Sequence, residues 1–150
     1  MLTSLVGNLL ESVNGSVFLE IGANIHSQGI IKRYPNFDVH CLFTPILMRA
    51  DKVKYFEKDY RFTLEDYIKT VPPVDVTFFS CIGVGQNDLA YVYFSITDVI
   101  PSNGLIIFDS INFDERSKRS WKHIKTLAKG IYEVIELHGK NVTGAIMRKL

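Results

Sequence analysis

The stretch Val74-Asp75-Val76-Thr77-Phe78-Phe79-Ser80 decides the fold class of this chain. Its centre is a nearly continuous run of β-branched and aromatic residues, without the polar alternation of a strand that has one wet face. A second stretch, Gly104-Leu-Ile-Ile-Phe-Asp109, has the same character. Strands of this kind are covered on both faces, as crossover helices require in a parallel sheet. We therefore expect both stretches to be central strands.

Short strand-like and longer helix-like segments alternate on either side of these two. Three further runs rich in β-branched or aromatic residues predict strands at 17–21, 39–43 and 53–57. Apolar residues at helical spacing predict helices at 2–13, 27–33, 63–70, 86–99 and 114–129. Two last runs, 131–137 and 142–149, are separated by His138-Gly-Lys-Asn141 and predict a hairpin. The pattern indicates an α/β fold with a Rossmann-like doubly wound sheet, mostly parallel, with an antiparallel C-terminal edge hairpin and helices on both faces.

Residues at the helix ends add detail to this prediction. Thr63 offers a capping hydroxyl at the start of 63–70, and Asp66 places a carboxylate in the first turn. In the helix at 114–129, Gly130 is the expected C-cap. We expect the inward face of that helix to consist of Trp121, Ile124, Leu127 and Ala128.

Composition favours one ordinary globular domain spanning residues 1–150. The chain is 47% apolar and 22% charged, with a net charge of +1, so it has no global field that would attract nucleic acid or an anionic membrane. No apolar run reaches the roughly 20 residues of a membrane span, and the first residues lack a signal-peptide pattern. We expect a cytoplasmic protein in which Cys41 and Cys81 are reduced core thiols. The spacing of cysteines and histidines gives no support for a zinc site.

The end of the first strand carries the most informative motif. Leu19-Glu20-Ile-Gly22-Ala23-Asn24-Ile-His26-Ser-Gln-Gly29 resembles the first motif of class I S-adenosylmethionine methyltransferases, in which a glycine lets the cofactor approach the backbone. Later landmarks follow the order of that family. Asp59-Tyr60 resembles the pair that borders the adenine, and Ile100 to Asp109 resembles the entry to the fifth strand. The tail at 143–149 resembles the closing strand of small-molecule O-methyltransferases.

The resemblance implies S-adenosylmethionine as cofactor and methyl transfer to a hydroxyl of a small molecule or sugar. Asp109 is the first candidate for a base or acceptor-orienting residue and His26 the second, because imidazole titrates near neutrality. No catalytic metal is expected, because Ser80, Asp109 and Ser110 would make a poor magnesium site. The residues expected to bind the cofactor are Glu20, Gly22, Ala23, Asn24, Thr44, Asp59, Tyr60 and Ser80.

Other interpretations stay open. His26 stands where the family usually has a second glycine, and the second strand runs into Thr44-Pro45 without a ribose-binding carboxylate, as in a degenerate methyltransferase-like scaffold. A dehydrogenase is less well supported, because no G-x-G-x-x-G follows the first strand. Asp109 could merely cap a turn. A homodimer is possible.

Two further motifs have both a structural and a functional interpretation. The glycines of the stretch 81–87 suit a turn that needs positive φ, and its free amides could also cradle an anion. A basic cluster fits a solvated helix face better than a site for an acidic partner; it consists of Arg116, Lys118, Arg119, Lys122 and Lys125.

Overall fold

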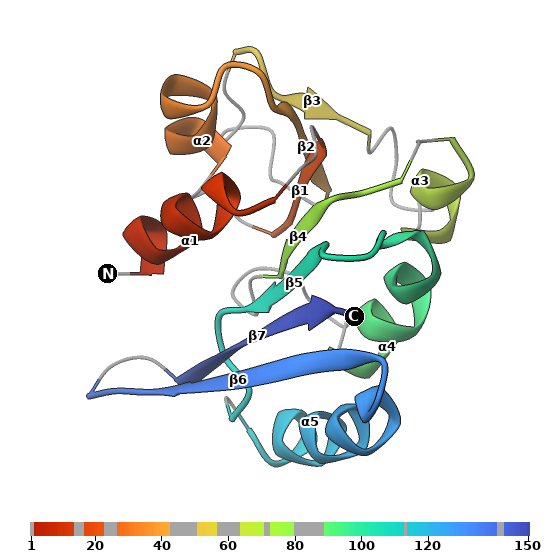
Figure 1. Ribbon diagram of the computed structural model, residues 1–150. Helices are drawn as coiled ribbons and strands as arrows, with labels where there is room; N and C mark the ends of the chain where they lie inside the picture. Colours follow the sequence, from red (N-terminus) through yellow and green to blue (C-terminus); the bar gives the residue numbers. More distant parts are fainter. Residues whose placement is uncertain are drawn as a thin grey trace.

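The computed structural model describes residues 2–13, 17–22, 27–42, 51–56, 64–70, 73–79, 89–112, 114–140 and 143–150. Helices and short strands alternate along the first part of the chain, and two long strands close it (Figure 1). The helices are α1 (Leu2–Glu11), α2 (Ser27–Arg33), α3 (Leu64–Thr70), α4 (Leu89–Ile96), the 3-10 turn η2 (Thr97–Val99) and α5 (Glu115–Ala128). The strands are β1 (Val17–Ile21), β2 (Asp38–Leu42), β3 (Lys54–Tyr55), β4 (Val76–Phe79), β5 (Leu105–Phe108), β6 (Tyr132–His138) and β7 (Thr143–Lys149).

The seven strands of the described ranges form one sheet in the order β3-β2-β1-β4-β5-β7-β6. The first five are parallel, whereas β7 lies antiparallel between β5 and β6. The strands β4 and β5 are buried along their whole length, as expected for central strands. The Rossmann-like class, the parallel centre and the antiparallel C-terminal edge are therefore confirmed.

Helices cover both faces of the sheet, with α1 and α2 on one side and α3, α4 and α5 on the other (Figure 1). Successive side chains of β1 point to opposite faces of the sheet and pack in two separate cores. Leu19 and Ile21 pack in the core that includes Tyr67 of α3 and Ile124 of α5. Phe18 packs in the other core, with Leu10 of α1 and Ile30 of α2. Each core needs the apolar side chains that one face of the strands supplies.

The observed elements differ from the predicted ones at their ends. Within the described residues 51–56, the strand expected at 53–57 covers Lys54–Tyr55, which pairs with His40 and Cys41 at the sheet edge. The placement of Leu127 in the core was wrong, because its side chain is 38% exposed. The buried stripe of α5 follows Trp121, Ile124 and Ala128, and Leu127 lies about 100° around the helix from Ala128.

The expected ends of two helices can be compared with the structure. Asp114 caps the start of α5 by accepting a hydrogen bond from the Ser117 amide at 2.7 Å. The C-cap of α5 is Lys129 and not the predicted Gly130, which follows it with φ +81° in a turn closed by the Ile131 N–H, donating to the Ala128 carbonyl at 2.9 Å. The cap expected at Thr63 and the start of α4 expected at 86–88 lie outside the described residues.

Candidate functional site

The end of β1 holds the two motif residues that the structure describes. Glu20 is fully buried between Cys41 of β2 and Phe78 of β4. Gly22 follows with φ +130°, and its N–H donates to the Leu42 carbonyl at 3.0 Å. This bond continues the pairing with β2 up to the point where the chain turns. A side chain at Gly22 would be strained, so the backbone conformation accounts for the glycine.

Asp109 lies at the same edge of the sheet, directly after β5. Its N–H donates to the Phe79 carbonyl at 3.1 Å, and its side chain is half-buried. On the other side, the Ile111 N–H donates to Thr143 at 2.8 Å. Since β5 and β1 flank β4, Gly22 and Asp109 are separated by two strand spacings, or about 10 Å. A small ligand could bridge this distance.

The described part of the chain thus brings Glu20, Gly22 and Asp109 together at the carboxyl edge of the sheet. Seven predicted site residues lie outside it, so their roles stay predictions: Ala23, Asn24, His26, Thr44, Asp59, Tyr60 and Ser80. The glycine-containing stretch at 81–87 also lies outside. Cys41 is a buried, reduced thiol, as expected.

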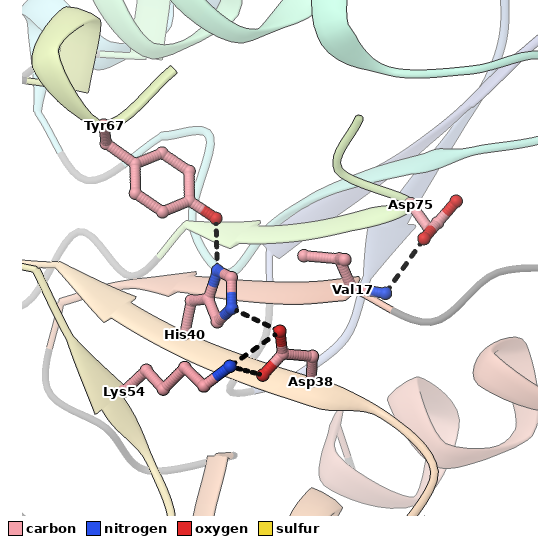
Figure 2. Close-up of polar contacts among 6 residues, drawn as sticks. All are labelled: Val17, Asp38, His40, Lys54, Tyr67 and Asp75. Atoms are coloured by element: carbon pink, nitrogen blue, oxygen red, sulfur yellow. Dashed lines mark hydrogen bonds and ion pairs between the residues drawn. The ribbon is translucent and has the colours of Figure 1, made fainter. Parts of the chain in front are cut away.

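A second polar group, which the sequence analysis did not single out, lies between β2, β3 and α3 (Figure 2). His40 is 2% exposed, and its Nδ1 lies 2.7 Å from the Tyr67 hydroxyl. Its Nε2 lies 3.0 Å from a carboxylate oxygen of Asp38, an ion-pair distance without hydrogen-bond alignment. Lys54 contacts both carboxylate oxygens of Asp38, at 2.9 and 3.1 Å. We call these four residues the His40 cluster.

Electrostatics indicate a neutral imidazole in this cluster. Burial lowers the pKa of His40, and the nearby Asp38 carboxylate only partly offsets this. Burial would raise the pKa of Asp38, but contacts with Lys54 and His40 outweigh it and leave that pKa lowered. Burial, followed by the charge of Asp38, raises the pKa of Tyr67. A neutral His40 with its proton on Nε2 can accept from Tyr67 and face Asp38.

Only part of the His40 cluster could have been predicted from the sequence. Asp38 and His40 are two residues apart on a strand, so both side chains must lie on one face of the sheet. Tyr67 joins them from α3, 27 residues beyond His40. No local pattern indicates that contact.

The basic cluster on α5 is exposed, as expected for a solvated helix face. Lys118 pairs with Glu115 at 2.6 Å, and Lys125 pairs with Glu136 of β6 at 2.8 Å. Across the described ranges, no three metal-binding side chains gather into a possible metal site. Within these same ranges, no helix has the length and apolar character needed to span a membrane.

Comparisons with known proteins find similarity in structure only. No family model and no curated protein sequence matches the chain. A proposed caffeoyl-CoA O-methyltransferase from Staphylococcus aureus superposes with a TM-score of 0.73 at 15% identity, over 97% of this chain and 82% of the other. Precorrin-6y C5,15-methyltransferase from Geobacter metallireducens gives 0.67 at 18% identity, over 99% and 87%. The methyltransferase MycE, solved with Mg, S-adenosylhomocysteine and mycinamycin VI, gives 0.65 at 14% identity, over 99% and 45%.

The chain therefore has the fold of class I S-adenosylmethionine-dependent methyltransferases. The residues described at its carboxyl edge fit such a cofactor in two respects. Gly22 leaves β1 with a positive φ and no side chain, and Glu20 places a carboxylate two residues before that turn. A nucleoside that lies against main-chain atoms needs the first feature, and the ammonium of its amino-acid portion suits the second.

Proposed function

We propose that this protein is an S-adenosylmethionine-dependent methyltransferase that methylates a hydroxyl of a small molecule or sugar without a metal. The observation that carries the proposal is the turn at Gly22, with φ +130° directly beyond the buried Glu20, in a methyltransferase fold. Open α/β sheets bind ligands at this edge, and β1 and β4 lie at the point where the strand order reverses.

Each site residue has a defined part in this proposal. The cofactor, when bound, supplies a methyl group on a positively charged sulfur. Gly22 and Ala23 present main-chain atoms to it, and Glu20 accepts from its amino group. Asp59 and Tyr60 border the adenine, and Asn24, Thr44 and Ser80 complete the binding rim. Asp109 orients the acceptor hydroxyl and takes its proton, with His26 as the second candidate.

Most of the rate in such a reaction comes from holding the acceptor in line, so little further machinery is needed. The backbone bonds of Asp109 to β4 and of Ile111 to β7 support this positioning role. The acceptor is a small molecule, bound by the rim or with the help of a second subunit in a homodimer. Neither nucleic acid nor a membrane has a part in the proposed reaction, which we place in the cytoplasm.

Calorimetric titration with S-adenosylhomocysteine tests the proposal, and a pair of glycine variants makes the test specific to the site. Gly22→Ala strains the backbone at the site, so we expect cofactor affinity to fall at least tenfold. Gly130→Ala is the matched control, because Gly130 also has positive φ, at +81°, and a side chain there would meet nothing within 4 Å. Its cofactor affinity should stay within twofold of the wild-type value.

Three other outcomes would contradict the proposal. Absence of heat at millimolar ligand would favour the degenerate scaffold. A preference for NAD would favour a dehydrogenase. If Gly22→Ala and Gly130→Ala changed the cofactor affinity equally, the turn at Gly22 would not be part of the cofactor site.

A further inference from the structure

The His40 cluster joins the two segments that flank residues 57–63. Phe56, just after β3, has its ring centroid 4.7 Å from that of His40 and 5.0 Å from that of Tyr67. Tyr67 approaches from α3 and meets the same imidazole, as Figure 2 shows for the hydroxyl contact. Phe56, at the end of the segment that contains β3, and Tyr67 of α3 thus both contact His40.

Both contacts at His40 are well buried. Tyr67 and Leu64 of α3 are 0% exposed, so α3 packs on the sheet through its first turns. The hydroxyl of Tyr67 has its hydrogen-bond partner in His40, and a buried hydroxyl without a partner is unfavourable. Lys54 of β3 forms an ion pair with Asp38, which in turn lies beside His40. The imidazole therefore adds a polar contact to the direct packing of Phe56 on Tyr67, and both contacts hold the end of β3 near the start of α3.

We propose that His40 is a positioning residue that fixes α3 against β3 and thereby sets the affinity of the cofactor site. The inference rests on the proposed function, in which Asp59 and Tyr60, within 57–63, border the adenine. His40 itself lies in the middle of β2, within the core, and acts through the two flanking segments. His40 thus influences cofactor affinity without touching the cofactor.

Two tyrosine variants test this inference. Tyr67→Phe removes only the hydroxyl that meets His40. Tyr132→Phe is the matched control, since its buried hydroxyl contacts Thr97 at 2.8 Å between β6 and η2, away from α3 and β3. We expect Tyr67→Phe to weaken S-adenosylhomocysteine binding about fivefold and to speed amide exchange in α3. Tyr132→Phe should leave both quantities near the wild-type values.

Variants of His40 separate positioning from general support of the core. Asn offers an amide oxygen near the position of Nδ1, whereas Leu offers no acceptor, so His40→Asn should retain more cofactor affinity than His40→Leu. The wild type should also lose affinity as the pH falls through the folded-state pKa of His40, which burial holds below the usual 6.5, because a protonated His40 cannot accept from Tyr67. The other groups that face His40 are Asp38, Lys54 and Tyr67. The pKa of Asp38 is lowered and that of Tyr67 is raised, so neither group changes charge between pH 5 and 7. His40→Asn should abolish this pH dependence.

The outcomes are distinguishable. If the wild type binds and both tyrosine variants lose affinity equally, His40 merely supports the core and the inference is overturned. An unchanged affinity in Tyr67→Phe also overturns it, even if His40→Leu fails to fold. If the wild type itself does not bind, the proposed function fails first, and the cofactor-directed role of His40 fails with it.

Discussion

The carboxylate of Asp75 accepts a hydrogen bond from the backbone N–H of Val17, 58 residues earlier in the chain, at 2.9 Å (Figure 2). The main chain of Asp75 completes the tie. Its N–H donates to the Val17 carbonyl at 3.1 Å, and its carbonyl accepts from Leu105 at 2.9 Å. One residue thus joins the starts of β1, β4 and β5. The candidate site lies at the opposite ends of these same three strands, so Asp75 sets the alignment on which the site depends.

Asp75→Ala should therefore destabilise the protein by about 1–2 kcal/mol, because a half-buried N–H loses a charged acceptor. Asp75→Asn keeps an oxygen acceptor and should lose less than about 1 kcal/mol. Urea unfolding of both variants measures the difference. The exposed Glu133→Ala provides the control and should change stability by no more than about 0.5 kcal/mol. Equal stability of the wild type and Asp75→Ala would show that the tie is unimportant.

Gly144 closes the sheet where β7 meets β5. A Cβ built there would lie 2.6 Å from the Phe108 carbonyl oxygen, a backbone atom that cannot move away cheaply. We expect Gly144→Ala to cost about 2 kcal/mol or more in the free energy of unfolding. Gly29→Ala, in α2 with nothing within 4 Å, should be neutral or stabilising. In thermal melts, Gly144→Ala should lower the Tm, whereas Gly29→Ala should leave it unchanged or raise it. An unchanged Tm in Gly144→Ala would contradict the tight contact.

The sequence predicted the sheet well because the composition of both central strands indicates that they are buried on both faces. Residues 76–79 and 105–108 have no polar face, and only a sheet covered on both sides accommodates two such runs. The glycine turn after Glu20 was also predictable, since positive φ has a strong residue preference. These signals are local and therefore visible in one sequence.

Long-range contacts were not predictable in the same way. Asp75 reads as part of a strand, yet it lies before β4 and its side chain reaches Val17. The hydroxyl contact of Tyr67 with His40 depends on how α3 packs on β2. Leu127 fits the helical period but lies beside the buried stripe. Each of these features depends on tertiary packing, which a single sequence does not specify.

Glu136 forms a polar cluster on the edge hairpin. Hydrogen bonds from Lys125 and Trp121 lower the pKa of its carboxyl to about 2. Since the folded-state pKa lies below the usual 4.5, the stabilisation is complete above pH 4.5 and is lost as the pH falls toward 2. We expect Glu136→Gln to be destabilised by about 1 kcal/mol at pH 7 and to match the wild type near pH 2. Urea unfolding at both pH values provides the measurement, and a constant difference would contradict the prediction.

His40 gives a second pH dependence at higher pH. Burial lowers its folded-state pKa below the usual 6.5, so the unfolded chain binds the proton more readily. The stabilisation is therefore complete above pH 6.5 and declines as the pH falls through the folded-state pKa. NMR titration of the imidazole should give a midpoint below 6.5 in the wild type. A midpoint at or above 6.5 would show that the ion pair with Asp38 outweighs burial.

The central claim is that the carboxyl edge at Gly22 binds a sulfonium nucleoside. The most direct test is a titration of the isotope-labelled protein with S-adenosylhomocysteine, observed by two-dimensional NMR. We predict saturable shifts at the amides of Ile21, Gly22 and Asp109, with little change at Asp75 and Gly104 on the opposite edge. No shifts at millimolar ligand, or shifts confined to Asp75 and Gly104, would contradict the claim.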